Sequence, residues 1–238
     1  MTPGNTQPQQ PACELTPHHG TQVLAFAGPK GCGKTEAAKY LLARNSLSGL
    51  NYFTRLNLAD PMKACCIEAF GLTWDECEEP QLKEQQLDRW PHLTPREIMQ
   101  KVPEALKKTF GDNLWIMRWL STAQDMMGQT GCIVLADLRF PEEAKILGQL
   151  KAKIIYIQND AAEERLAKAK EAGDPKALHP SEAHYDYLRS ISHATVDNNG
   201  SIEDLYTNVA RTAKSLLGDW RNWDVPTTSM HKLRTGEF

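Results

Sequence analysis

The chain has 238 residues and a formal net charge of -3, and 41% of its residues are hydrophobic. This length suits one α/β domain with a sizeable core, and the charge argues against broad electrostatic binding to nucleic acid or to an anionic membrane. No apolar run has the length of a membrane span, and the N-terminus lacks a signal pattern. We therefore expect a cytoplasmic protein without nucleic-acid or membrane partners.

Three regions follow one another along the chain. Residues 1–20 are rich in proline, glutamine and threonine and are interpreted as a disordered leader. Residues 21–218 alternate apolar runs with helical patterns, and residues 219–238 lose this period and are interpreted as a tail. The predicted strands are residues 22–27, 52–59, 132–137, 153–158 and 194–197. Such alternation predicts a parallel sheet with helices on both faces and with ligands beyond the carboxyl ends of its strands.

The sequence GPKGCGKT directly follows the first predicted strand and precedes a helical pattern. Glycines let the backbone N–H groups of such a loop turn toward an anion, and the helix N-terminus adds partial positive charge. Lys34 supplies a cation for the β- and γ-phosphates, and the Thr35 hydroxyl suits Mg²⁺. The residues expected to contact ATP here are Gly28, Lys30, Gly31, Cys32, Gly33, Lys34, Thr35 and Glu36.

The six cysteines of the chain include no C-x-x-C pair. Cys65 and Cys66 are adjacent and lie in an apolar helical pattern, which favours buried thiols in a reducing compartment over a metal site. Cys32 lies inside the glycine-rich loop, where we expect it to contribute its backbone.

The second predicted strand ends in LADPMK. In one interpretation Asp60 faces the γ-phosphate and Lys63 meets the phosphate of an acceptor; in the other, Asp60 caps a helix that has a proline at its first position. Residues 61–131 are too many for a single crossover and are interpreted as an insertion that binds the acceptor. Its acidic part, residues 72–93, contains two prolines and is expected to be partly mobile.

The string LTPREIMQ predicts the start of a helix, because Thr94 and Glu97 match a capping box. Arg96 and Gln100 are four residues apart and share one face of this helix. A guanidinium beside an amide suits a phosphate together with a base or sugar edge, and the alternative is a solvated pair on a surface helix. Pro103 is expected to end or kink the helix.

Asp137 follows an apolar run at the end of the third predicted strand. This position resembles that of a Walker B carboxylate, which completes a Mg²⁺ site. Arg139 and Glu143 come next. The position of Arg139 beside a phosphate site favours a functional role, and the alternative is a structural ion pair with Glu142 or Glu143.

Residues 159–184 follow the fourth predicted strand and are interpreted as a lid whose closure excludes water. Arg165 is its candidate ATP contact, whereas a solvated face is the preferred interpretation for Lys168 and Lys170. Beyond the last strand, Asn198 and Asn199 border the adenine in one interpretation. In the other, this loop serves to place Ser201 as the cap of a helix over residues 201–217.

The motifs described above occur in the order found in bacteriophage-type deoxynucleoside monophosphate kinases. The same order includes Trp115, HPSE at residues 179–182 and DNNGS at residues 197–201. The chain resembles this family over roughly residues 22–217. The resemblance implies a three-layer P-loop kinase fold with a five-stranded parallel sheet, helical insertions that form an acceptor site and a lid, and a homodimer. It also implies transfer of the γ-phosphoryl group of ATP to a deoxynucleoside 5′-monophosphate.

The residues and the resemblance together define the expected site. The expected catalytic residues are Lys34, Asp60, Asp137 and Arg139, and the expected Mg²⁺ ligands are Thr35 and Asp137. The expected acceptor contacts are Lys63, Arg96, Gln100, Trp115, Arg139 and Glu143. Outside the glycine-rich loop, the expected ATP contacts are Arg165 and Asn199.

The chain departs from the family at two places. The family often has Gly-Thr shortly after the glutamine of TPREIMQ, whereas this chain has Val102-Pro103-Glu104 there. This difference leaves the base preference open. In addition, Cys32 stands where serine is common in the family.

One rival function is a P-loop kinase of another small metabolite, such as a coenzyme precursor or sugar acid. A second rival, a DNA-handling ATPase switched by nucleotide, expects a basic surface with exposed aromatic residues.

Overall fold

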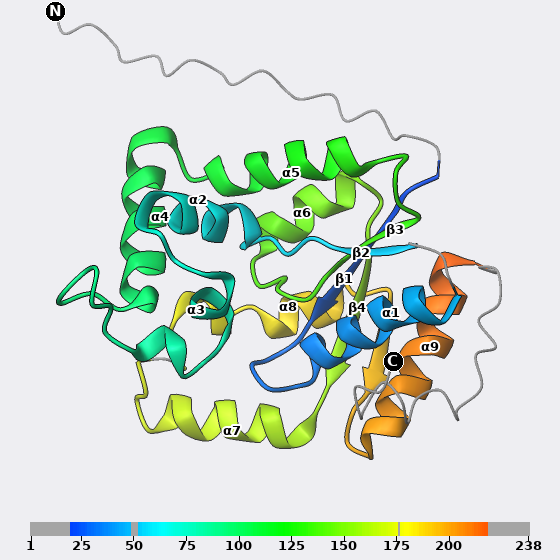
Figure 1. The fold of residues 1–238 in the computed structure, drawn as a ribbon. Coiled ribbons are helices and arrows are strands. Elements are labelled where there is room, and N and C mark those ends of the chain that lie inside the picture. The colour runs from blue at the N-terminus through cyan, green and yellow to red at the C-terminus, as the bar shows by residue number, and fades with distance from the viewer. Residues whose placement is uncertain (1–19, 49–51, 176, 219–238) are drawn as a thin grey trace, which may run out of the picture.

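The computed structural model describes residues 20–48, 52–175 and 177–218 (Figure 1), so the predicted leader, apart from Gly20, and the predicted tail lie outside the described residues. The strands are β1 (Gln22–Ala27), β2 (Phe53–Arg55), β3 (Cys132–Leu135), β4 (Lys153–Gln158) and β5 (Ala194–Asp197). The helices are α1 (Lys34–Ser48), α2 (Asp60–Phe70), α3 (Trp74–Glu78), α4 (Pro95–Phe110), α5 (Leu114–Met126), α6 (Pro141–Gln149), α7 (Asp160–Glu171), α8 (Tyr185–Ser190) and α9 (Ile202–Leu217). Two short 3-10 segments are η1 (Leu82–Glu84) and η2 (Pro180–Glu182).

The five strands form one parallel sheet in the order β2-β3-β1-β4-β5. The predicted α/β class with a five-stranded parallel sheet is therefore confirmed. Leu24 of β1 pairs with Val134 of β3 on one side and with Lys153 of β4 on the other. Because β1 is the middle strand, the loop that follows it lies at the centre of the carboxyl edge of the sheet.

Three of the predicted strands have the predicted bounds, and β2 and β3 end earlier than predicted. The backbone N–H groups of Leu58 and Ala59 bond to the Asp137 carboxylate, and the N–H of Ala136 bonds to the side chain of Asn57. After a last backbone hydrogen bond from Leu56 to Val134, side chains thus replace the backbone ladder between the two segments. The residues that were predicted to extend these strands form a loop-to-loop junction at the carboxyl edge.

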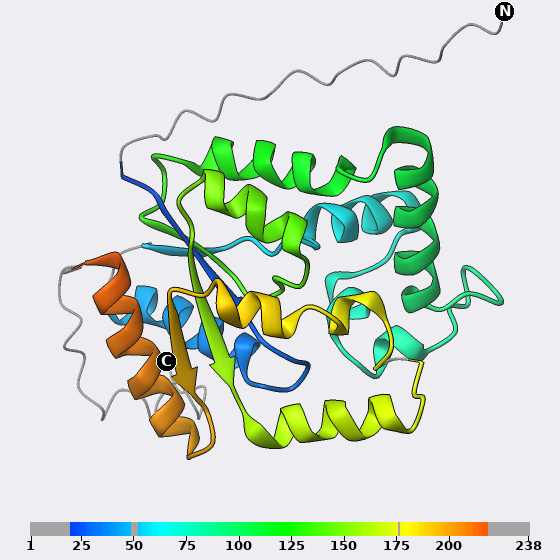
Figure 2. The same cartoon turned by 180° about the vertical axis from the view of Figure 1, so that it is seen from behind.

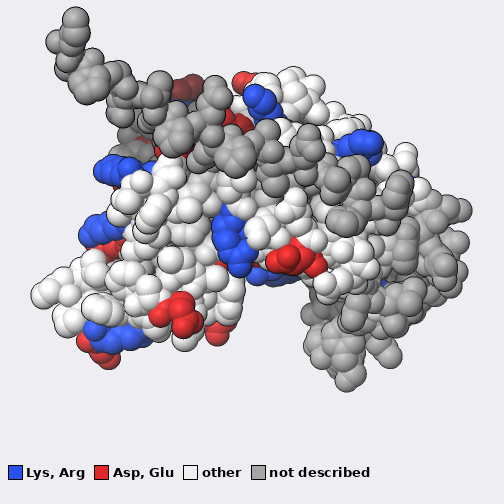
Figure 3. Space-filling view, turned by 90° about the horizontal axis from the view of Figure 1, so that it is seen from above, with Lys and Arg blue, Asp and Glu red and all other residues white. Residues whose placement is uncertain are grey.

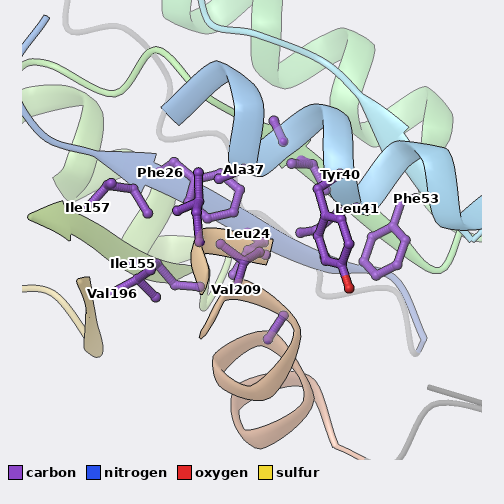
Figure 4. Close-up of a cluster of buried hydrophobic side chains, with 14 of the residues drawn as sticks. Leu24, Phe26, Ala37, Tyr40, Leu41, Phe53, Ile155, Ile157, Val196 and Val209 are labelled. Carbon is purple, nitrogen blue, oxygen red and sulfur yellow. The ribbon is translucent and has the colours of Figure 1, made fainter. Parts of the chain in front are cut away.

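One face of the sheet packs against α1 and α9. Leu24 and Phe26 alternate along β1 and point toward this face, where they meet Leu41 of α1 and Val209 of α9 (Figure 4). Tyr40 stacks on Tyr206 with ring centroids 4.7 Å apart, which joins the two helices directly. Burial of this cluster fixes α1, and with it the loop between β1 and α1.

The opposite face packs against α5, α6 and α8 (Figure 2). Val23, Ala25 and Ala27 of β1 point this way, as the period of a strand requires. Trp119 of α5 is fully buried in this cluster, and its indole N–H donates a 3.0 Å hydrogen bond to the carbonyl of Leu56. The sheet with its two helical layers gives the three-layer arrangement.

The insertion between β2 and β3 has a small apolar cluster of its own. Cys66 of α2, Leu72, Cys77 of α3, Leu87 and Ile98 of α4 form it. The stretch that was expected to be partly mobile, residues 72–93, thus contains α3, η1 and three of these buried side chains. A capping box between Thr73 and Glu76 begins α3. Within the insertion, residues 72–93 therefore pack on α2 and α4.

Helix α4 begins as predicted, and of the two effects expected of Pro103 the structure excludes an end of the helix there. Thr94 and Glu97 form the capping box. The helix does not end at Pro103 but runs on to Phe110. A proline inside a helix removes one backbone hydrogen bond, and the packing of Ile98 and Val102 in the insertion cluster holds the turns before it in place.

Helix α9 is capped by Ser201 and Asp204, as the second interpretation of its loop predicted. Its buried face includes Leu205, Val209 and Leu217, and Leu216 is partly buried against the same cluster. The described cysteines are free thiols, and all of them except Cys65 are buried. Within the described ranges, none of the helices combines the length and the apolar character that a bilayer crossing requires.

Candidate active site

The glycine-rich loop connects β1 to α1 with three glycines in the left-handed half of backbone space. Gly28, Gly31 and Gly33 have φ angles of 137°, 82° and 106°, which L side chains rarely adopt. A Cβ on Gly28 would lie 2.7 Å from the carbonyl oxygen of Ile157 in β4. Close approach to the sheet as well as backbone conformation therefore requires glycine there.

Lys34 is buried beneath this loop. Its ammonium donates hydrogen bonds to the carbonyls of Gly28 (2.5 Å) and Pro29 (2.8 Å) and lies 3.8 Å from the Cys32 thiol. Burial lowers the pKa of Lys34, and the charges of Arg139 and Glu182 also reach it, the first lowering and the second raising that pKa. The loop thus holds the ammonium by neutral carbonyl oxygens, for which an anionic phosphate oxygen is a stronger competitor.

Cys32 contacts its surroundings through its backbone and through its thiol. Its carbonyl accepts a 2.8 Å hydrogen bond from the Asn198 amide, which ties the loop to the end of β5. Its thiol is fully buried, and that burial raises its pKa. Lys30 of the loop and Thr35 in the first turn of α1 are exposed, and Glu36 pairs with Lys39 on the surface of α1.

Asp137 joins the end of β3 to the loop between β2 and α2. Its two carboxylate oxygens accept the backbone N–H groups of Leu58 and Ala59, each at 2.9 Å. Burial raises the pKa of Asp137, while these two hydrogen bonds and the charge of Lys63 oppose that rise. The Asp137 carboxylate therefore holds the start of α2 beside the sheet. Its oxygens retain lone pairs for a further ligand.

Asp60 does not cap α2 in the way that one interpretation proposed. The N-cap is Ala59, and the Asp60 carboxylate instead accepts the backbone N–H of Asn57 at 2.8 Å. Its other oxygen, Oδ1, is buried and makes no hydrogen bond to the described residues; the Lys63 ammonium lies 3.7 Å from it. The buried Oδ1 therefore remains open to a polar ligand.

A cluster of charges surrounds Lys63, and part of it was not predicted. The Lys63 ammonium lies 2.7 Å from the carboxylate of Glu78 in α3, which also pairs with Arg55 at 3.3 Å. Lys83 of η1 is close enough to Glu78, Lys63 and Arg96 for their charges to affect its pKa, which burial lowers. Positive side chains from β2, α2, η1 and α4 therefore gather on one side of the insertion.

The three predicted acceptor residues of α4 and α5 differ in their surroundings. Arg96 bonds through Nε to the carboxylate of Glu84 in η1, and 40% of its side chain is exposed. Gln100 is exposed on the same helix. Trp115 is half-buried, and its indole N–H donates a 3.4 Å hydrogen bond to the carbonyl of Pro103.

Arg139 does not form an ion pair with Glu142 or Glu143. Its Nη1 instead donates to the Ser181 hydroxyl (3.2 Å) and to Glu182 (3.3 Å) in η2. Glu143 caps α6: one of its oxygens, Oε2, accepts the backbone N–H groups of both Arg139 and Phe140. Burial raises the pKa of Glu143 to about 7, against the effect of these two hydrogen bonds.

The α7 helix lies beside the glycine-rich loop (Figure 1). The Nη2 atom of Arg165 is 3.3 Å from the position that a Cβ on Gly31 would occupy. Lys168 pairs with Glu164 on the exposed face, as the solvated interpretation predicted. Lys170 differs from that interpretation, because its ammonium donates a 2.7 Å hydrogen bond to the carbonyl of Glu182.

Asn199 holds the start of α7 in this structure. Its side-chain oxygen accepts the backbone N–H of Asp160 at 2.8 Å, and its amide donates to Asp197. Asn159 caps the same helix and bonds to the carbonyl of Asn198. The loop after β5 therefore connects the glycine-rich loop and α7.

Hard oxygen ligands at this edge of the sheet suit Mg²⁺, which binds through one or two carboxylates together with phosphates and water. The Asp137 carboxylate, the buried Asp60 Oδ1 and the Thr35 hydroxyl are such ligands. Among the described residues there is no group of three or more His, Cys, Asp or Glu side chains that would hold a metal ion without a substrate. The residues thus fit a metal ion that arrives with a phosphate ligand.

Charged side chains of both signs are scattered over the face of the molecule shown in Figure 3. Positive (blue) and negative (red) side chains are interspersed there among neutral residues. A protein that binds nucleic acid by its charge presents a basic patch or stripe. The described part of this face shows mixed charge instead.

Comparison with known proteins gives one relative and a set of similar folds. No family model matches the chain. A protein of Acanthamoeba polyphaga mimivirus named "Putative deoxynucleotide monophosphate kinase" is 30% identical over 198 residues, covering 79% of this chain and 93% of the relative. TT1252 from Thermus thermophilus aligns with a TM-score of 0.52 at 19% identity, over 84% of this chain and 100% of that structure. A dephospho-CoA kinase from Campylobacter jejuni aligns with a TM-score of 0.46 at 15% identity, over 82% and 96% of the two chains.

Proposed function

Because the chain belongs to the P-loop nucleoside monophosphate kinase-like family of its viral relative, we propose that it transfers the γ-phosphoryl group of ATP to a deoxynucleoside 5′-monophosphate. The products are ADP and the deoxynucleoside diphosphate, a precursor for DNA synthesis. The proposed kinase domain spans residues 21–218, with residues 61–131 as the acceptor-binding insertion and residues 159–184 as the lid.

The observation that carries this proposal is the junction at Asp137. Its carboxylate binds two backbone N–H groups of the β2–α2 loop, and β3 lies between β1 and β2 in the sheet. The triphosphate-binding loop after β1 and the cations that follow β2 therefore face one edge of the sheet. Transfer between two nucleotides requires two anion sites side by side, because catalysis here consists mainly of positioning and charge neutralisation.

The donor side of the proposed site is the glycine-rich loop. We assign Lys34 to the β- and γ-phosphates and Arg165, which lies against Gly31, to the same phosphates from the lid. The other proposed ATP contacts are Gly28, Lys30, Cys32, Gly33, Thr35, Glu36 and Asn199. Thr35 and Asp137 would hold Mg²⁺, which neutralises phosphate charge when it is bound.

The acceptor side of the proposed site consists of Lys63, Arg96, Gln100, Trp115 and Glu143, with Arg139 and Asp60 between donor and acceptor. Carboxylates hold three of these cations in the structure: Glu78 holds Lys63, Glu84 holds Arg96 and Glu182 holds Arg139. A phosphate carries more charge than a carboxylate and forms bidentate bonds with arginine. Binding of the monophosphate is therefore expected to displace the exposed Glu84 from Arg96.

The lid completes the mechanism. The cations neutralise the charge of both phosphate groups. In-line transfer also requires the exclusion of water, because water would otherwise accept the phosphoryl group. Helix α7 is suited to this role since Arg165 reaches the glycine-rich loop from it.

An ADP-release assay with individual acceptors tests the proposal. The purified chain with ATP and Mg²⁺ should release ADP only when a deoxynucleoside monophosphate is added, and the panel should include the common deoxy- and ribonucleoside monophosphates. Release with a coenzyme precursor or sugar acid alone would favour a kinase of another metabolite. Release that depends on DNA and not on a small acceptor would favour a nucleotide-switched ATPase.

A further inference from the structure

Glu182 is a buried acid in contact with a proposed catalytic arginine. Only 5% of Glu182 is exposed. Its Oε1 accepts a 3.3 Å hydrogen bond from Arg139, and its Oε2 accepts a 2.6 Å hydrogen bond from the Tyr185 hydroxyl. Burial of an ionised carboxylate is unfavourable unless both oxygens have partners. The Tyr185 hydroxyl thus fixes the carboxylate, and the carboxylate fixes one side of the Arg139 guanidinium.

The same residue contacts the proposed lid. The ammonium of Lys170 in α7 donates a 2.7 Å hydrogen bond to the backbone carbonyl of Glu182. Ser181, the preceding residue, is also buried and accepts a 3.2 Å hydrogen bond from Arg139. Helix α7 also carries Arg165 beside the glycine-rich loop, so η2 contacts both Arg139 and the helix that bears Arg165.

We propose that Glu182 is a positioning residue for phosphoryl transfer: it holds the Arg139 guanidinium toward the reacting phosphates and connects Arg139 to helix α7 through Lys170. A guanidinium has five N–H donors in a fixed plane, so the bonds from Nη1 to η2 orient the remaining donors. Free arginine side chains lose more rotational freedom when they bind a phosphate, and this pre-orientation reduces that loss. The inference rests on the proposed function.

A double-mutant cycle separates positioning from a merely structural role. Glu182→Gln keeps the shape of the side chain and removes its charge. We expect it to lower kcat on the order of 10- to 100-fold, with small changes in the KM values of ATP and of the monophosphate. In an Arg139→Ala background the same substitution should lower kcat no further, because no guanidinium remains to be positioned.

The proposal also predicts the direction in which Glu182→Gln changes kcat in the Arg139→Ala background. In Arg139→Ala alone, the Glu182 carboxylate is left buried without its cationic partner and close to Lys34. It would then repel the phosphates, so the double variant should be equal to or more active than Arg139→Ala. A further fall in kcat by the same factor as in the wild-type background would overturn the proposal.

Two matched controls accompany the cycle. Glu142→Gln removes a carboxylate near Arg139 in the sequence that is exposed and unpaired among the described residues, and it should leave kcat unchanged. Lys170→Ala should lower kcat several-fold, whereas Lys168→Ala, on the exposed face of the same helix, should not. Equal effects of the two lysine variants would overturn the connection to α7.

Folding and function are checked in the same experiment. If Glu182→Gln does not fold, Tyr185→Phe removes only the hydroxyl that fixes Oε2, and its smaller fall in kcat should likewise vanish in the Arg139→Ala background. Wild-type chain without turnover on any monophosphate would overturn the proposed function and this inference together. Wild-type turnover with additive effects in the cycle would overturn this inference alone.

Discussion

Replacement of Glu143 by glutamine is expected to stabilise the protein at neutral pH. Both backbone N–H groups that cap α6 bond to the same oxygen, Oε2. The single amide oxygen of glutamine can accept both of them, and glutamine is an accepted residue at this position of a capping box. The substitution therefore keeps the cap and removes a charge that burial makes unfavourable.

The size of this effect follows from the pKa of Glu143, which rises from 4.5 to about 7 in the folded protein. At about 1.4 kcal/mol for each pH unit, this rise corresponds to up to about 3 kcal/mol. A raised pKa means that the folded state binds the proton more tightly than the unfolded state. Its stabilisation is complete below pH 4.5 and is lost as the pH rises through 7.

Urea unfolding of the wild type and of Glu143→Gln between pH 4.5 and 8 measures the effect. The difference in the free energy of unfolding should be near zero at pH 4.5 and should reach up to about 3 kcal/mol in favour of the variant at pH 8. Taking the difference removes the contributions of most other titrating groups. A difference that does not change with pH, or a variant that is less stable at pH 8, would refute the reasoning.

Three further substitutions have distinct expected outcomes. Lys34→Ala should abolish phosphoryl transfer and leave the circular dichroism spectrum intact, and retained turnover would refute its role at the phosphates. Arg96→Ala should raise the KM of the monophosphate on the order of 10- to 100-fold with little change for ATP, because a hydrogen-bonded charge contact is lost; equal changes for both substrates would exclude Arg96 from the acceptor side. Gly131→Ala should lower the free energy of unfolding by about 1–3 kcal/mol or more, because its Cβ would lie 1.7 Å from the ring of Tyr52; a thermal melt equal to that of the wild type would contradict this contact.

The central part of the fold was predictable because its signals are local. Local sequence patterns mark β1, β4 and β5 with the observed bounds, and Thr94 and Glu97 mark the capping box of α4. The ends of β2 and β3 were predicted too late. A carboxylate from one loop binds the backbone of another loop 78 and 79 residues away, and a local apolar pattern carries no trace of such a contact.

The unpredicted members of the candidate site share this reason. Glu182 meets Arg139 over a separation of 43 residues, and Glu78 meets Arg55 over 23. Each acid alone resembles any surface carboxylate in the sequence. The HPSE string contained Glu182, but the sequence assigned this residue no role in the site. Only the fold shows that the carboxylate is buried against a cation.

The continuation of α4 past Pro103 has a different cause. Proline removes one backbone hydrogen bond, and the sequence rule weighs only this local loss. In the folded chain, Val102 packs in the insertion cluster, and the carbonyl of Pro103 accepts the indole N–H of Trp115. Tertiary contacts on both sides of the proline thus compensate for the missing bond.

The destination of the γ-phosphoryl group tests the central proposal most directly. The chain is incubated with ATP labelled in its γ-phosphate, Mg²⁺ and each deoxynucleoside monophosphate in turn, and the products are separated. The label should appear in a deoxynucleoside diphosphate, and Lys34→Ala should produce none. Label that appears only in inorganic phosphate, or in no nucleotide with any of these acceptors, would contradict a two-nucleotide site.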